Sequence, residues 1–184
     1  MLRSVHAKRG SQSAATALAA CLLALSTSAA GAESAAAAGC RGAGAQAASA
    51  SPGKLRSALL CIVNRKRAAN GLRALKGDRR LQKAAGRHAR DMVRNNFFAH
   101  QRPGGPDLTA RLRRAGWRGN AWGETIAYGC GAMSSPRSTV RMWMHSPPHK
   151  AIILSGTYGH GGIGVTESAP CGRGSMWVLD VGRK

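Results

Sequence analysis

Three short segments of this chain place a titratable side chain among small or apolar neighbours. They are Phe98-Ala99-His100, Gly123-Glu124-Thr125-Ile126-Ala127 and Ser146-Pro147-Pro148-His149. The whole chain has only seven acidic residues, so a glutamate that precedes apolar residues stands out. About 25 residues separate each segment from the next, so only the fold can bring them together. Two imidazoles and a carboxylate in one place form a metal site or an acid–base site.

Two kinds of chemistry are open to these residues. As a metal site, His100, His149 and Glu124 would hold Zn²⁺ or another divalent cation, and water would complete the coordination shell. As a catalytic site, the same three would activate a water molecule for hydrolysis. The chain has no His-Glu-x-x-His helix, no Gly-x-Ser-x-Gly segment and no cysteine placed as a nucleophile. An enzymatic function therefore depends on these three residues alone, and we expect no organic cofactor.

Helix caps and apolar periodicity predict the elements that must position these residues. Ser51-Pro52, Ser135-Pro136 and Ser146-Pro147 each pair an N-cap residue with a proline suited to the first helical turn, and Asp78 and Asp107 are further caps. The predicted helices cover about 52–69, 79–93, 108–115, 136–144 and 147–154. The predicted strands cover 125–128, 162–166 and 176–181, and the last two form a hairpin through Pro170-Cys171-Gly172. This order is typical of an α+β or layered domain and not of repeated βαβ units.

The N-terminal region has the composition of an export signal. Arg3, Lys8 and Arg9 precede an apolar stretch from Ala14 to Leu25, and Ala30-Gly31-Ala32 is a suitable cleavage site. We therefore predict a signal peptide at 1–32 and a secreted, extracellular protein without a transmembrane segment. A lipoprotein box around Cys21 is the alternative. Residues 33–53 are rich in Ala, Gly and Ser and predict a flexible linker, which leaves 54–184 as one domain.

The cysteines predict disulfides. Without the signal peptide, four remain: Cys40, Cys61, Cys130 and Cys171. An even number in an exported chain indicates two disulfides, with three possible connectivities, and free buried thiols are the alternative. No pair has the Cys-x-x-Cys spacing of a zinc knuckle.

The charge of the chain is strongly positive. The formal net charge is +21, and it is +18 once the three basic residues of the signal peptide are removed. We favour a solvated basic surface and a monomer; the alternative is binding to an anionic polymer, an acidic lipid or a nucleic acid. Arginines concentrate at 79–80, 87–94 and 111–118 without interleaved surface aromatics, which argues against specific nucleic-acid binding.

A longer set of segments resembles the CAP superfamily, which includes cysteine-rich secretory proteins, antigen 5 and pathogenesis-related 1 proteins. The resemblance covers about 55–184 and implies a three-layer α-β-α sandwich with a small, mostly antiparallel sheet. It also implies a cleft lined by two histidines and two glutamates. The matching segments are Leu60-Cys61-Ile62-Val63-Asn64-Arg65-Lys66-Arg67, Gly71-Leu72 with Leu75, His88-Ala89-Arg90-Asp91-Met92, Phe98-Ala99-His100, Gly123-Glu124-Thr125-Ile126-Ala127, Trp143-Met144-His145-Ser146-Pro147-Pro148-His149 and Gly162-Ile163-Gly164-Val165.

The resemblance assigns His100 and His149 to the two family histidines and Glu124 to the first glutamate. The second family glutamate falls near Ser146, so the tetrad is reduced to a triad. The resemblance also implies a Cys40–Cys61 disulfide, which leaves Cys130 to pair with Cys171. It implies binding of a lipid, a sterol or a cell-wall ligand more than established catalysis.

Three functions follow as expectations. The first is a CAP module that binds a metal, a small lipid or a wall component. The second is a protease-like hydrolase, and the third is an electrostatic binder of anionic cell-surface polymers. Outside the triad we expect His88 to be a hydrogen-bonded core residue and His145 to lie on the surface. We also expect the positive end of its helix to lower the pKa of His149.

Overall fold

A four-stranded sheet with helices on both faces makes up the protein in the computed structural model, which describes residues 39–184. The strands are β1 (Lys76–Gly77), β2 (Ala121–Cys130), β3 (His160–Thr166) and β4 (Gly174–Arg183). They lie in the order β1-β3-β4-β2. Both β2 and β3 pair antiparallel with the central β4, and only β1 pairs in parallel, with β3. The predicted signal peptide at 1–32 lies outside the described residues.

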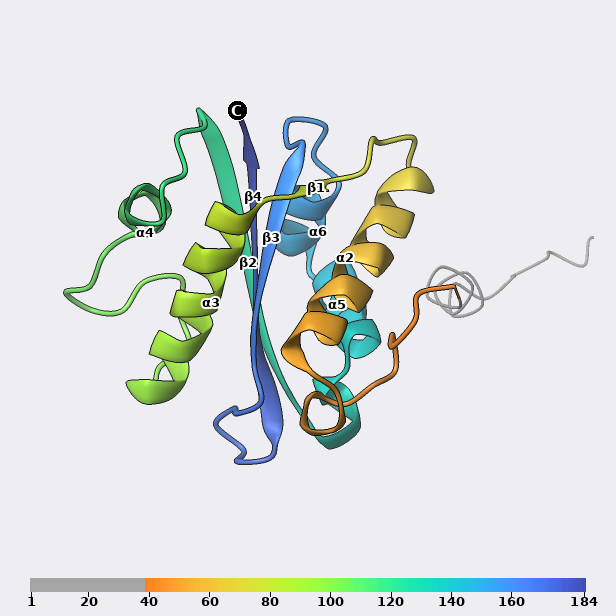
Figure 1. Cartoon of the computed structure of the whole chain (residues 1–184), viewed down its shortest axis with the longest axis vertical. Coiled ribbons are helices and arrows are strands. Elements are labelled where there is room, and N and C mark those ends of the chain that lie inside the picture. The colour runs from red at the N-terminus through yellow and green to blue at the C-terminus, as the bar shows by residue number, and fades with distance from the viewer. Residues whose placement is uncertain (1–38) are drawn as a thin grey trace, which may run out of the picture.

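Helices cover both faces of this sheet (Figure 1). On one face lie α3 (Arg79–Arg94) and α4 (Leu108–Arg114). On the other lie α2 (Pro52–Ala68), α5 (Pro136–His145) and α6 (Pro147–Ile153). Two short 3₁₀ turns, η1 (Ala47–Ser49) and η2 (Gly131–Ser134), complete the described elements. The expected α+β fold with three α-β-α layers is confirmed. None of the described helices is long and apolar enough to cross a bilayer.

The predicted caps explain where the helices begin. The side chains of Asp78, Asp107 and Ser135 accept hydrogen bonds from the backbone N–H groups of Arg80, Ala110 and Ser138. These bonds satisfy N–H groups that have no partner within the helix. Ser51 precedes α2 and Ser146 precedes α6. Both helices begin with proline and have no side-chain cap bond.

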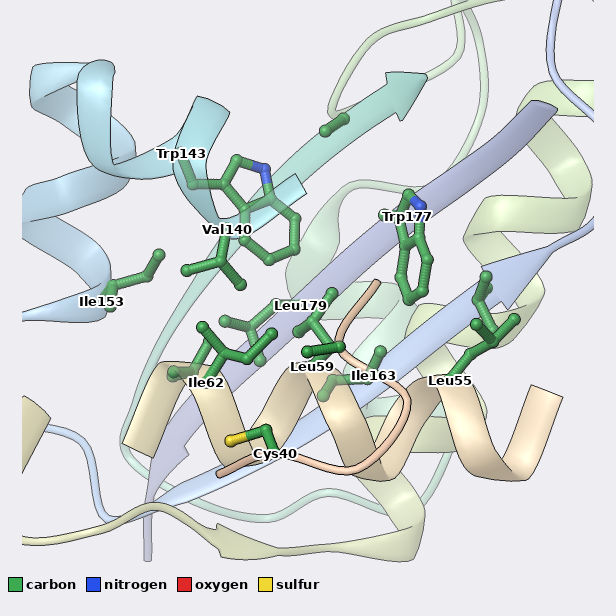
Figure 2. Packing of buried hydrophobic residues seen from close by; sticks show 14 of the residues in the cluster. Cys40, Leu55, Leu59, Ile62, Val140, Trp143, Ile153, Ile163, Trp177 and Leu179 are labelled. Carbon is green, nitrogen blue, oxygen red and sulfur yellow. The ribbon is translucent and has the colours of Figure 1, made fainter. Parts of the chain in front are cut away.

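The larger core lies between the sheet and α2, α5 and α6. Figure 2 shows Leu59 and Ile62 of α2 beneath Trp143 of α5 and Leu179 of β4. All four side chains are almost fully buried. Because alternate residues of β4 point to opposite faces, Leu179 faces α2 while Val178 faces α3.

The opposite face is packed unusually closely against α3. A Cβ atom built on Gly162 would lie 2.0 Å from the backbone nitrogen of Gln82, and one on Gly164 would lie 2.3 Å from the carbonyl carbon of Ala85. Only glycine permits this approach of helix to strand. The small alanine side chains of α3 also permit β3 to lie close to the helix.

The segment before α2 differs from the flexible linker expected there. Within residues 39–53, Cys40, Ala43 and Ala47 are buried against the larger core. Cys40 is bonded to Cys61 in α2, with the two Cα atoms 5.8 Å apart. Small side chains can pack where there is little space, so a composition poor in bulky residues did not prevent this segment from joining the core.

A second disulfide links Cys130 to Cys171, with a Cα–Cα distance of 6.2 Å. Cys130 is the last residue of β2, and Cys171 lies in the turn between β3 and β4. The bridge therefore ties the end of the edge strand β2 to the rest of the sheet. The two bonds are those implied by the resemblance.

Candidate functional site

Glu124 is the centre of a buried polar cluster. It lies on β2 with its side chain only 1% exposed, on the face of the sheet that α3 covers. One carboxylate oxygen, Oε1, lies 2.8 Å from His100 Nδ1. The other, Oε2, accepts a hydrogen bond from Arg111 Nη2. Glu124 is therefore buried and paired with both His100 and Arg111.

Arg111 is a partner of Glu124 that the sequence analysis did not identify. Its guanidinium donates through Nη2 to Glu124 and through Nη1 to the backbone carbonyl of His100. One side chain from α4 therefore holds both the carboxylate and the segment that carries the histidine. The sequence does contain an indication that Arg111 faces inward. One face of the helix is formed by Leu108, Arg111, Leu112 and Ala115, which have the spacing of an apolar helix face. An arginine on such a face is buried, so its guanidinium needs a buried hydrogen-bond acceptor.

His88 supports the same segment from α3. Its ring is 1% exposed, and Nε2 lies 3.1 Å from the carbonyl oxygen of Ala99 and 3.9 Å from Glu124 Oε1. Burial lowers the pKa of His88, although the nearby charge of Glu124 opposes the shift. A neutral His88 donating from Nε2 to Ala99 accounts for the geometry. The expectation of a hydrogen-bonded core histidine is confirmed.

Asp180 places a second carboxyl group beside Glu124. The two residues are direct partners in the β2–β4 register, so their side chains lie on the same face. Asp180 is fully buried, and neither of its oxygens has a hydrogen-bond partner among residues 39–184. Burial and the charge of Glu124 raise the pKa of Asp180 well above its usual range. Asp180 is therefore the neutral member of the pair.

Glu124 is the charged member. Burial alone would raise its pKa, but the hydrogen bond from His100 and the positive charge of Arg111 outweigh burial. The pKa of Glu124 is therefore lower than usual. Environment thus separates two adjacent carboxyl groups into one anion and one neutral acid.

His149 approaches His100 from the other side of the edge strand. It lies in the first turn of α6, and the two imidazole centroids are 6.5 Å apart. The pKa of His149 is lowered, as predicted, but the causes are burial and the neighbouring His100. The helix end proposed from the sequence is not among those causes.

A cleft of about 480 Å³ runs along β2 between these histidines and α5. Most of its lining is apolar, and Phe98 and Tyr128 remain 45% and 42% exposed. Their rings meet edge to face at a centroid distance of 5.0 Å. The lining residues are Phe98, Ala99, His100, Ile126, Ala127, Tyr128, Met142, Trp143, Ser146 and His149.

Two side chains donate hydrogen bonds to backbone carbonyls of the edge strand β2. Trp143 Nε1 donates to the carbonyl of Ile126 at 3.0 Å, and the Tyr158 hydroxyl donates to the carbonyl of Trp122 at 3.2 Å. The first bond fixes α5 against β2 and thereby sets one wall of the cleft. Trp143 is buried and forms part of the cleft lining.

The arrangement leaves one histidine nitrogen free for chemistry. If Nδ1 of His100 donates its proton to Glu124, Nε2 carries the lone pair. His100 is 56% exposed, so this nitrogen is accessible to a proton or a cation. Such a carboxylate-oriented imidazole suits either base catalysis or metal binding.

Metal binding by His100, His149 and Glu124 remains a prediction. Among residues 39–184, no group of three or more His, Cys, Asp or Glu side chains is arranged to hold an ion. Glu124 was predicted as a ligand, but both its oxygens are engaged by His100 and Arg111. Glu124 instead orients His100. Two imidazoles bound to one tetrahedral zinc ion have centroids roughly 5 Å apart. At 6.5 Å, the rings of His100 and His149 would have to move closer to share one ion.

The remaining predicted positions are also located. His145 is exposed, as expected, and its Nδ1 faces the carbonyl of Arg141 in its own helix. Ser146, near the place of the missing second glutamate, lines the cleft. None of the lining residues of the cleft is acidic. The carboxyl group next to Glu124 is that of Asp180, its partner in the β2–β4 register.

Comparison with known proteins agrees with this fold. The description of the cysteine-rich secretory protein (CAP) family matches residues 60–181. The chain belongs to this family. Two curated relatives come from Bacillus subtilis (strain 168), and both are 32% identical to it. One, the uncharacterized protein YkwD, aligns over 117 residues, which are 64% of this chain and 42% of the relative.

The other, the uncharacterized membrane protein YlbC, aligns over 107 residues, which are 58% of this chain and 30% of the relative. This chain therefore spans less than half the length of these two CAP relatives.

Two solved structures share the CAP fold. An extracellular SCP-domain protein from Bacillus anthracis superposes with a TM-score of 0.64 at 24% identity, over 73% of this chain and 44% of that one. An outer surface protein from Borrelia burgdorferi superposes with a TM-score of 0.59 at 22% identity, over 68% of this chain and 90% of that one. At these identities the likeness establishes the fold alone.

Proposed function

We propose that this protein is an exported CAP-domain module that binds an amphipathic small molecule, such as a fatty acid, a sterol or a wall component, in the cleft along β2. The observation that carries the proposal is a mostly apolar cleft of about 480 Å³ with two histidines in its lining. This volume is in the range of small-molecule sites. The exposed Phe98 and Tyr128 would be covered by an apolar chain, and the histidines would meet a polar head group.

A fluorescent fatty acid tests this proposal by titration of the purified exported protein. Phe98→Ser should weaken binding about tenfold, because it removes most of one aromatic contact surface. Met133→Ser is the matched control, since Met133 is similarly exposed at 41% but does not line the cleft. Equal affinities for the wild type and Phe98→Ser would refute a site in the cleft. Mass spectrometry of co-purified lipids would identify the natural ligand.

A divalent cation would be held here by His100 and His149 with water, and such a two-nitrogen set predicts weak binding. Protonated imidazole cannot bind a metal, so zinc affinity should fall as pH drops through the histidine range. Burial lowers the pKa of His149, which keeps this nitrogen available to lower pH than an exposed histidine. Calorimetry at pH 7.5 and 5.5 measures this dependence. The double change His100→Ala/His149→Ala should abolish binding and His145→Ala should not.

A second candidate, a hydrolase, is favoured by one observation. The 2.8 Å bond between His100 Nδ1 and Glu124 orients the imidazole as a general base would be oriented. Glu124→Gln would remove the charge that stabilises the protonated ring, and turnover should fall while ligand binding in the cleft persists. Peptide and ester substrates incubated with wild type test this function. An absence of turnover across both classes would leave binding as the function.

Two features support the proposal that the protein is exported. The predicted signal peptide at 1–32 precedes the domain, and two disulfides are typical of proteins in oxidising compartments. N-terminal sequencing of protein from the culture medium should begin after Ala32. A retained N-terminus in a cytoplasmic fraction would contradict export.

A further inference from the structure

A second cavity lies on the other side of the Glu124 cluster, between α3 and α4. Its volume is about 460 Å³. Arg87, Arg90 and Arg94 of α3 and Arg111 and Arg114 of α4 all line it. We call this cavity the arginine groove. It is distinct from the apolar cleft, with which it shares no lining residue.

The positive charge of the arginine groove is not balanced by the protein. Arg87, Arg90 and Arg94 follow one face of α3 at spacings of three and four residues, where like charges repel. Asp91 is the one carboxylate among the lining residues. It already accepts a 2.7 Å hydrogen bond from Asn95 and lies 3.8 Å from Arg102. An anion in the groove would relieve the repulsion among these guanidinium groups.

One buried nitrogen at the same cavity points to the same class of ligand. Arg111 Nε has no hydrogen-bond partner among residues 39–184, and the side chain of Arg111 is 9% exposed. The other two nitrogens of the Arg111 guanidinium donate hydrogen bonds to Glu124 and to the backbone carbonyl of His100. Unpaired buried nitrogens are costly, and Arg111 Nε needs an oxygen acceptor.

From these observations we propose that the arginine groove binds an anion with two or more phosphate groups. Guanidinium forks match the paired oxygens of phosphate and form strong charge-assisted hydrogen bonds with them. Several converging arginines require several closely spaced negative charges, which a single carboxylate does not offer. The lining includes no Phe, Tyr or Trp side chain, and the ring of His88 is 1% exposed, so a nucleobase would find no stacking surface.

The test uses the mature exported chain with inorganic tripolyphosphate as the probe, titrated by calorimetry in 150 mM NaCl. The groove variant is Arg87→Gln/Arg90→Gln/Arg94→Gln. Its control is Arg137→Gln/Arg141→Gln/Arg173→Gln, which removes the same charge from exposed residues outside the groove. Glutamine has a helix propensity similar to that of arginine, so α3 should remain intact.

The groove variant should bind tripolyphosphate at least about tenfold more weakly, because three charge-assisted contacts are lost, while the control stays within about twofold. Equal losses in both variants would show that only bulk charge attracts the anion and would overturn the proposal. So would an absence of wild-type binding in this buffer. If the groove variant fails to fold, the exposed Arg114→Gln provides the same comparison from α4, against Arg137→Gln.

Further probes distinguish the source of the phosphate. Orthophosphate should bind more weakly than tripolyphosphate, because one phosphate group engages fewer arginines. Phosphatidylcholine vesicles with and without phosphatidylglycerol test a lipid source. Groove-dependent binding to the anionic vesicles, with no binding of tripolyphosphate, would assign the groove to membranes and overturn the proposal of a polyphosphorylated anion. Fatty-acid binding in the apolar cleft should be unchanged in the groove variant, so the two proposals can fail separately.

Discussion

Arg111 is the residue on which the polar cluster depends most. It neutralises a carboxylate that is 1% exposed and simultaneously holds the carbonyl of His100. Removing one partner of a buried ion pair leaves an uncompensated charge, which typically costs about 3–5 kcal/mol. We therefore expect Arg111→Leu to lower the free energy of unfolding by roughly this amount.

Urea unfolding measures this loss, and Arg114→Leu is the control on the same helix. Arg114 is exposed, and an exposed substitution should change stability by no more than about 0.5 kcal/mol. A similar small change for Arg111→Leu would show that His100 alone compensates the charge of Glu124.

Asp180 makes the stability of the protein depend on pH in an unusual direction. Its pKa is raised in the folded protein, so folding favours the protonated form. The stabilising effect is complete below the unfolded pKa of about 3.9 and is lost as pH rises toward the folded pKa. Asp180→Asn, which stays neutral, should therefore exceed wild type in stability at pH 7.5.

The expected gain is the free energy that wild type loses because Asp180 is ionised in the unfolded chain at pH 7.5 but neutral in the folded protein. Denaturant unfolding at pH 7.5 and pH 3.5 provides the comparison, because the difference between the two proteins should shrink at the acidic pH. Glu124→Gln is the contrasting variant, since it removes the charged member of the pair and should be destabilising at pH 7.5. A constant difference between Asp180→Asn and wild type at both pH values would mean that Asp180 does not change its protonation.

Among the elements, α3 depends on glycines in the strand beneath it. A Cβ atom on Gly164 would lie 2.3 Å from the backbone of Ala85, which cannot move without displacing the helix. Gly164→Ala should cost about 1–3 kcal/mol in unfolding free energy, the usual range for overpacked cores. The displaced helix would also move His88 and weaken its bond to Ala99.

Gly159→Ala is the matched control for this change. No heavy atom lies within 4 Å of a Cβ built on Gly159, immediately before β3, and its φ is outside the range that strains other residues. Thermal unfolding should separate the two variants clearly. Similar melting temperatures would show that α3 can shift over β3 without loss.

The elements themselves were largely predictable from local signals. Caps and prolines fix helix starts through short-range hydrogen bonds, so all five predicted helices were found within about two residues of their ends. The strands extend further than predicted, because pairing between β2 and β4 recruits Gly123 of β2 and Gly174 of β4, which have little strand propensity. The two-residue β1 was not predicted, since Lys76-Gly77 becomes a strand only by pairing with β3.

The site was only half predictable, because part of it depends on contacts between elements that no local signal in the sequence specifies. His100, Glu124 and His149 were found because their segments resemble a family pattern. Arg111 lies in an arginine-rich stretch, where composition conceals which residue faces inward. Asp180 is neighbour to Glu124 only through strand register, which a single sequence does not specify.

At the scale of the whole molecule, the excess of positive charge opposes folding. The chain carries 28 Lys and Arg residues against seven acidic ones. Salt shortens the range of repulsion from about 10 Å at 0.1 M to about 3 Å at 1 M. We therefore expect NaCl between 0.05 and 0.5 M to raise the free energy of unfolding, by about 1 kcal/mol.

Tripolyphosphate at the same ionic strength separates screening from binding. A bound anion stabilises the folded state beyond screening, so the wild type should gain more from it than the groove variant does. Stability that falls with added NaCl would contradict repulsion as the dominant electrostatic effect and would point to loss of internal ion pairs instead.

The two hydrogen bonds on the outer side of β2 also bear on how copies of this protein behave toward one another. An edge strand offers unpaired carbonyl and N–H groups to any passing strand, and such edges initiate aggregation. Trp143 and Tyr158 occupy the carbonyls of Ile126 and Trp122 with side chains of the same chain. At these two carbonyls a strand from another molecule would find no free acceptor. These two bonds, of which the one from Trp143 also sets a wall of the cleft, thereby help to protect the edge strand β2 against self-association.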